Sequence, residues 1–75
     1  MHPGRLDRDT AAARVHKALQ AAQGRWIDGW RLSQLARVTA VSTRVSEIRH
    51  QGVAVEAEMR VWDGQRQWYY RIPKG

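Results

Sequence analysis

Cysteine is absent from this chain of 75 residues, and long apolar runs are absent as well. Without cysteine the chain can form neither a disulfide framework nor a thiolate metal site, which fits a reducing compartment. No run approaches the roughly 18 apolar residues that a membrane span requires. The first ten residues, MHPGRLDRDT, also lack the apolar core of a secretory signal. We therefore expect a cytoplasmic protein without a membrane partner.

Patterns that mark catalysis are missing too. The three histidines, His2, His16 and His50, show neither metal-ligand spacing nor a carboxylate pair nearby at a helical step. No glycine-rich phosphate loop occurs, and no serine lies on a strand-to-helix elbow. The sequence therefore predicts a protein that is not an enzyme and that uses neither a metal nor a cofactor.

Positive charge is what the chain has in excess. Lysine and arginine number 13 against 7 acidic residues, which gives a net charge of +6. Arginine dispersed over a compact domain creates a positive field that attracts polyanions such as nucleic acids. Solubility alone is the plainer interpretation, because many small proteins are basic. An anionic membrane surface fits less well, since no helix combines a lysine-rich face with a broad aromatic face.

The length allows one small domain, which buries only roughly 60% of its unfolded surface. Residues 1–8 are polar and include Pro3 and Gly4, so we expect a flexible amino terminus followed by a domain over 9–73. No internal repeat or low-complexity tract interrupts it.

The first predicted helix covers about 10–23. Asp9 or Thr10 is its candidate cap, and Gly24 offers a left-handed stop. Its apolar residues fall on one stripe, made of Ala11, Val15, Ala18, Leu19 and Ala22.

The second predicted helix covers about 29–37 and follows a short apolar strand at 26–27. Asp28 is a good cap for it, and Ile27 can pack on a leucine one turn into the helix. A start at Ser33 is the alternative.

The third predicted helix covers about 40–51, with Thr39 as its cap and Gly52 as its stop. Its apolar residues lie three, four and three apart, which predicts one narrow buried stripe: Val38, Val41, Val45 and Ile48. Because β-branched residues are poor helix formers, this helix must depend on packing.

A β-hairpin is predicted after the third helix. The dipeptide Asp63-Gly64 is typical of a two-residue type I′ turn, which sets Trp62 opposite Gln65. The same register pairs Met59 with Trp68, Ala57 with Tyr70 and Val55 with Ile72 on one apolar face, and Arg60 with Gln67, Glu58 with Tyr69 and Glu56 with Arg71 on the other.

Three short helices and a terminal hairpin predict an α+β domain. The second and third helices together resemble a helix-turn-helix, and the added hairpin makes the chain similar to the winged helix-turn-helix family. The resemblance is carried by GRWIDGWRLSQLARVTAVSTRVSEIRHQGVAVEAE and by WYYRI, and RVSEIRHQG is similar to small phage and prophage winged-helix proteins. It implies a three-helix fold with a C-terminal hairpin wing, duplex DNA as the partner and a role in transcription regulation or an accessory role. The fold also serves in protein-binding modules, so the alternative is a protein–protein interaction module without DNA binding.

In helix-turn-helix proteins the second helix of the motif lies in the major groove. Carried onto this sequence, the resemblance implies DNA contacts from the outward residues of the third helix: Ser42, Thr43, Arg44, Ser46, Arg49 and His50. An ordinary solvated helix face is the alternative, and for Glu47 we favour a local ion pair with Arg44 or Arg49.

Near the hairpin tip, Arg60, Gln65 and Arg66 are candidates for contacts with the DNA backbone or the minor groove. Charged residues there can also protect an exposed strand from aggregation. Arg31, Arg37 and Lys17 are weaker candidates for phosphate contacts.

The four tryptophans and two tyrosines divide into two groups. We expect Trp26, Trp68 and Tyr70 in the core, and Trp30, Trp62 and Tyr69 partly exposed. An exposed aromatic trio can form a homodimer or partner surface, and aromatic rings can also stack on unpaired bases.

Overall fold

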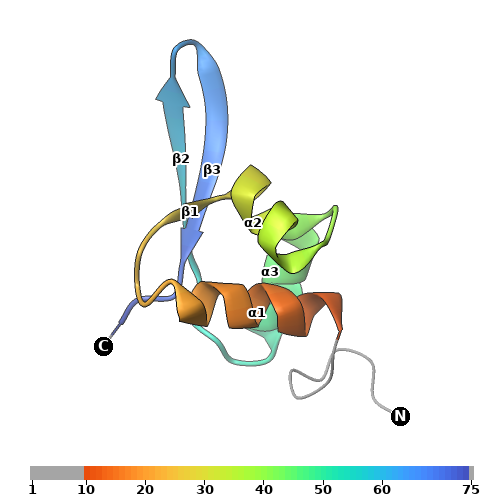
Figure 1. Cartoon of the computed structure of the whole chain (residues 1–75). Coiled ribbons are helices and arrows are strands. Elements are labelled where there is room, and N and C mark those ends of the chain that lie inside the picture. The colour runs from red at the N-terminus through yellow and green to blue at the C-terminus, as the bar shows by residue number, and fades with distance from the viewer. Residues whose placement is uncertain (1–9, 75) are drawn as a thin grey trace.

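The computed structural model describes residues 10–74, which form three helices and one three-stranded antiparallel sheet. In chain order the elements are α1 (Ala11–Ala21), β1 (Ile27–Asp28), α2 (Gly29–Ala36), α3 (Val41–His50), β2 (Glu56–Trp62) and β3 (Gln65–Arg71). The helices gather at one end, and the hairpin of β2 and β3 rises away from them (Figure 1). The predicted α+β class is confirmed, whereas the predicted flexible segment 1–8 lies outside the described residues. Within residues 10–74 no helix is long and apolar enough to cross a bilayer.

Helix α1 begins at its predicted cap. The Thr10 hydroxyl accepts a hydrogen bond from the Ala13 amide at 3.0 Å. The helix ends two residues earlier than expected, because Gln23 and Gly24 both adopt positive φ, at 53° and 86°. Ala12 is buried and Ala11 only half-buried, so the predicted stripe was wrong by one residue at its start.

Helix α2 starts where Asp28 caps it. The Asp28 carboxylate accepts a hydrogen bond from the Arg31 amide at 2.7 Å, which excludes the alternative start at Ser33. The short strand before it is Ile27–Asp28, one residue later than predicted, because its partners on β3 are Tyr70 and Tyr69. The cap therefore also joins the sheet to the helix.

Replacing Asp28 by alanine should lower the free energy of unfolding by about 1 kcal/mol, the usual value of a lost helix cap. The asparagine variant keeps an acceptor oxygen and should lose much less. Urea denaturation followed by circular dichroism measures both. Equal losses in the two variants would show that the carboxylate acts through its charge and not as a cap.

Helix α3 has no side-chain cap, so the prediction that Thr39 caps it was wrong. The cap position belongs to Ala40, whose carbonyl accepts a hydrogen bond from the Arg44 amide at 3.1 Å. The predicted stripe is confirmed where the helix is formed, since Val41, Val45 and Ile48 are buried. Gly52, with φ of 94°, stops the helix as predicted.

The hairpin has the predicted register at every pair from Glu56–Arg71 to Trp62–Gln65. Asp63 and Gly64 both have positive φ, at 51° and 75°, as a type I′ turn requires. Since the strand order is β1-β3-β2, the strand β2 forms a free edge of the sheet.

The sheet has two faces. We call inner face the one that meets the helices; it carries Ala57, Met59, Val61, Arg66, Trp68 and Tyr70. We call outer face the opposite one; it carries Glu56, Glu58, Arg60, Trp62, Gln65, Gln67, Tyr69 and Arg71.

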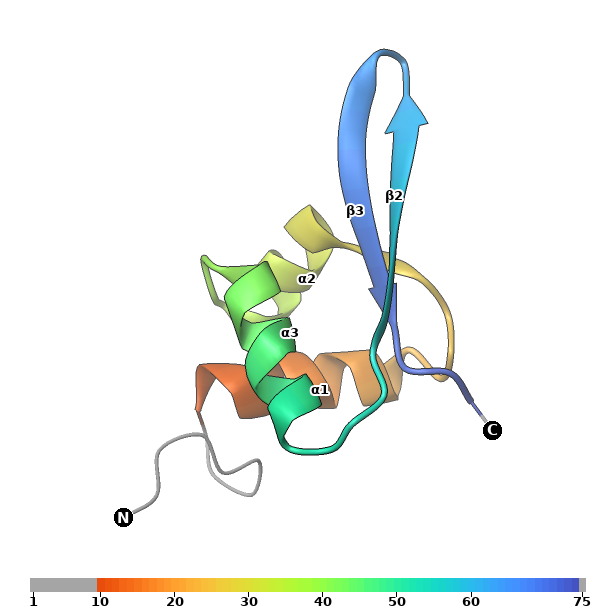
Figure 2. The ribbon, with the colours of Figure 1, turned by 180° about the vertical axis from the view of Figure 1, so that it is seen from behind.

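The core lies between the three helices and the base of the hairpin. Its buried residues are Ala12, Val15, Leu19, Leu32, Ala36, Val41, Val45, Ile48, Val55 and Tyr70. Tyr70 is in the core as predicted, whereas Trp68 is 51% exposed and its predicted core position was wrong. The reason is the reach of the hairpin, whose upper half extends beyond the helices in both views (Figures 1 and 2). The predicted core position of Trp26 was also wrong, because this ring is half-buried beside the outer face and lies against Arg71.

Candidate nucleic-acid interface

Four of the predicted site residues form one exposed row on α3. Ser42, Thr43, Ser46 and His50 are all exposed, opposite the buried stripe of the same helix. None of the four side chains makes a hydrogen bond or an ion pair with another residue in the part of the chain that the structure describes. We call them the α3 polar row. Their hydroxyl and imidazole groups are free to meet a ligand.

Arg44 lies beside this row but is half-buried. Its Nε is 3.3 Å from the Glu47 carboxylate, which confirms the predicted local ion pair of Glu47. The same nitrogen is buried and has no hydrogen-bond partner among the described residues, so the contact is a charge attraction rather than an aligned hydrogen bond. Surface pairs of this kind are worth only about 0.3–0.5 kcal/mol, so the guanidinium can change partner at small cost.

Arg49 has a structural role. Its Nε and Nη2 both donate to the Val55 carbonyl, at 3.1 and 2.8 Å, and join the end of α3 to the segment before β2. The neighbouring Tyr70 is a core residue: burial raises the pKa of its hydroxyl, and the positive charge of Arg49 partly opposes that rise. Contact of Arg49 with DNA stays a prediction, but two of its donors already have a partner.

Between α2 and α3, Arg37 adopts a left-handed conformation, with φ of 56° and ψ of 50°. This is the conformation that glycine often supplies in the turn of a helix-turn-helix. Arg37 and Arg31 are both exposed and make no side-chain hydrogen bond or ion pair with described residues. Both guanidinium groups are therefore available to an anion.

His16 adds little to the positive field of the helices. His16 on α1 is half-buried, and burial lowers its pKa below the ordinary value of 6.5. The neutral form of this side chain is thus favoured at neutral pH, and arginine carries most of the charge.

The outer face of the hairpin holds Arg60, which the sequence placed near the tip. Its Nε is 2.6 Å from the Glu58 carboxylate, and its guanidinium lies 4.4 Å from the ring centre of Tyr69. Arg71 is held in the same way, 2.6 Å from the Glu56 carboxylate and 4.6 Å from the ring centre of Trp26. The charges of this face therefore compensate one another, and contact of Arg60 with DNA stays a prediction.

At the tip itself, Gln65 and Arg66 are exposed as predicted. Gln65 lies on the outer face and Arg66 on the inner face, since neighbouring residues of a strand alternate. Neither side chain makes a hydrogen bond or an ion pair with another described residue.

The three aromatic residues expected to be partly exposed are at least partly exposed, and Trp68 is exposed as well. Trp30 and Trp62 are exposed, at 69% and 80%, while Tyr69 is half-buried beneath Arg60. Sequence reasoning missed Met59 and Val61, which are exposed on the inner face. The length of the strands could have predicted this exposure. Strands of seven residues reach beyond helices as short as these, which cover only the base of the hairpin.

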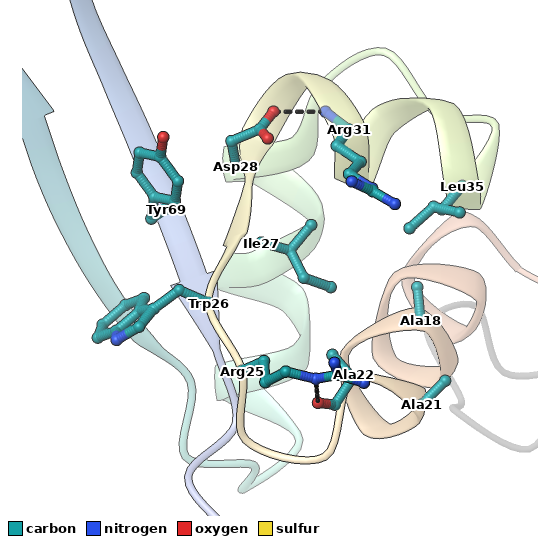
Figure 3. Close-up of a pocket in the computed structure, with 10 residues that line it drawn as sticks. All are labelled: Ala18, Ala21, Ala22, Arg25, Trp26, Ile27, Asp28, Arg31, Leu35 and Tyr69. Atoms are coloured by element: carbon teal, nitrogen blue, oxygen red, sulfur yellow. Dashed lines mark hydrogen bonds between the residues drawn. The ribbon is translucent and has the colours of Figure 1, made fainter. Parts of the chain in front are cut away.

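A groove of 380 Å³ lies between the end of α1, β1 and the outward side of α2. Figure 3 shows Ala18, Ala21 and Leu35 on its apolar walls and Arg31 at its rim. The Asp28 carboxylate in its lining is occupied by the α2 cap. The groove therefore offers apolar surface and positive charge to a ligand.

Comparisons with protein families, with curated proteins and with solved structures found no match for this chain. We therefore infer its function from its own residues and geometry.

Proposed function

We propose that this protein is a winged helix-turn-helix protein that binds duplex DNA, with α3 in the major groove and the hairpin as the wing. The single observation that carries the proposal is the α3 polar row, which faces outward above a buried apolar stripe. The element order and the strand order β1-β3-β2 are compatible with a winged-helix layout. The sequence resemblance to small phage and prophage proteins favours a transcriptional regulator or accessory factor in the cytoplasm.

The α3 polar row suits the edges of bases. Serine and threonine hydroxyl groups both donate and accept hydrogen bonds, so Ser42, Thr43 and Ser46 can meet several bases. Arg44 can match the two acceptors of guanine if it leaves Glu47.

Phosphate contacts are available next to the row. The free guanidinium group of Arg37 belongs to the turn that precedes α3, while that of Arg31 lies at the groove beside α2. In addition, α3 lacks a side-chain cap, which leaves its first-turn amides open to an anion. Arg66 and Gln65 at the wing tip supply a second, separate set of contacts.

Duplex affinity should fall steeply with salt. If six phosphates are neutralised, the log–log slope of affinity against salt is about −5, so affinity falls roughly 1,000-fold between 50 and 200 mM salt. Fluorescence anisotropy of a labelled duplex at several salt concentrations measures this slope. A flat slope, or no binding at 50 mM salt, would overturn the proposal. Tighter binding to the matching single strand would assign the protein to unpaired nucleic acid instead.

A protein–protein interaction module is the second candidate, favoured by the exposure of Trp30 and Trp62. Large exposed aromatic side chains are enriched where proteins bind one another. Quenching of tryptophan fluorescence by a protein partner, together with absent duplex binding, would favour it.

A further inference from the structure

The free edge of the sheet is formed by the whole length of β2, which has seven residues. All seven residues of β2 are exposed, and its pairing with β3 continues without a bulge from Glu56 to Trp62. Exposed edges are commonly blunted by bulges, proline or charged side chains. This strand has no proline, and the charges of Glu58 and Arg60 are already paired at 2.6 Å. The edge therefore has neither a bulge nor a proline, and its Glu58 and Arg60 charges compensate each other.

The backbone groups that this edge offers follow from the turn. In a two-residue hairpin the residues next to the turn, here Trp62 and Gln65, form a hydrogen-bonded pair. Bonded pairs alternate along an antiparallel ladder, so the intervening residues of β2 direct their N–H and C=O groups away from β3. These outward residues are Ala57, Met59 and Val61.

We propose that β2 pairs antiparallel with β2 of a second copy of this chain, about a two-fold axis at Met59. Each outward residue then lies opposite an outward residue of the second copy. Met59 lies opposite Met59 of that copy, and Ala57 lies opposite its Val61. On the outer face Glu58 comes opposite Arg60, twice because of the symmetry. The result is one six-stranded sheet with strand order β1-β3-β2-β2-β3-β1.

The charge pattern selects this register. An axis at Glu58 would set two Glu58 carboxylates opposite each other, and an axis at Arg60 would do the same for two guanidinium groups. Like charges directly opposite across strands are destabilising, whereas opposite charges stabilise. The axis at Met59 sets Glu58 opposite Arg60 twice and sets no like charges opposite each other, which the axes at Glu58 and Arg60 do not achieve.

Burial favours the same pairing. Val61 is 64% exposed and Met59 is exposed beside it, both on the inner face. In the dimer Met59 lies against Met59 of the second copy and Val61 lies against its Ala57, which removes apolar surface from water. An axis perpendicular to the sheet keeps both inner faces on one side, so the helices of both copies also lie on one side. The dimer forms whether or not α3 binds DNA, so the two proposals can fail separately.

Sedimentation equilibrium without DNA tests the pairing. The wild-type chain, of 8.7 kDa, should sediment as a dimer of twice that mass. Glu58→Arg creates two like-charge pairs across the axis and should raise the dimer dissociation constant roughly tenfold to 100-fold. The double variant Glu58→Arg/Arg60→Glu should restore the dimer. Glu56→Arg is the matched control: it adds the same charge and breaks an ion pair to Arg71, but faces no charge across the axis.

A unique thiol tests the register itself, because the chain has no cysteine. In a bonded pair at the axis the Cα atoms are roughly 5.5 Å apart, so Met59→Cys should cross-link through a short bismaleimide. Gln65→Cys at the tip is also exposed, but the strand rise puts its two copies more than roughly 20 Å apart, and it should stay uncoupled. A wild-type chain that stays monomeric up to roughly millimolar concentration, an unrestored double variant, or equal cross-linking at the two positions overturns the proposal.

Discussion

Replacement of Leu32 by alanine should lower the free energy of unfolding by about 2–5 kcal/mol, enough to unfold much of the protein. Leu32 is fully buried at the centre of the core, where α2 meets α1 and α3. Removal of its side chain leaves a cavity, and the atoms around it lose contacts that no other side chain can replace. A domain of this size has a free energy of unfolding of roughly 5 kcal/mol. The measurement is urea denaturation followed by circular dichroism.

Leu35 is the matched control for this experiment, because it lies on the same helix and is 58% exposed. The same substitution there should change the free energy of unfolding by less than roughly 0.5 kcal/mol. Comparable losses at the two positions would mean that Leu35 is covered in solution. The apolar groove beside Leu35 would then have an occupant.

The elements with strong local signals were predictable from the sequence. The hairpin register followed from one dipeptide, because Asp63 and Gly64 accept the positive φ that the turn demands and a slip of one residue would exchange the two faces. The stripe of α3 followed from its spacing alone. Its burial leaves the α3 polar row exposed, which is why this part of the candidate site was found.

Residues whose roles depend on distant partners were not predictable in the same way. Arg49 and Arg60 look like free cations in the sequence, but the fold brings a carbonyl to one and a carboxylate and a ring to the other. Thr39 looks like a cap, but the helix begins one residue after the position it would need, and Arg37 makes the turn instead. Local sequence patterns do not predict such contacts, because the partners come together only when the whole chain has folded.

The double substitution Thr43→Glu/Ser46→Glu should lower duplex affinity by at least roughly 100-fold. Loss of a base contact costs about 1–3 kcal/mol, and two such contacts are replaced here by carboxylates that face phosphates. The fold should survive, because both side chains are exposed and glutamate is a good helix former. At position 43, in the first turn of α3, the carboxylate also interacts favourably with the helix dipole. A loss of affinity can therefore not come from unfolding, and denaturation curves of the variant would verify this.

The control for charge is Gln20→Glu/Gln23→Glu, which adds the same two negative charges at the far end of α1, where both residues are exposed. It lowers the positive field of the whole protein equally but leaves the α3 polar row intact. Since exposed charges farther apart than roughly 10 Å are largely screened at 0.1 M salt, the control should cost only a few-fold in affinity. Equal losses in the two double variants would mean that binding follows net charge and that α3 does not enter the groove. A selective loss at Thr43 and Ser46 would assign the contact to α3, because only there do the added carboxylates meet the duplex directly.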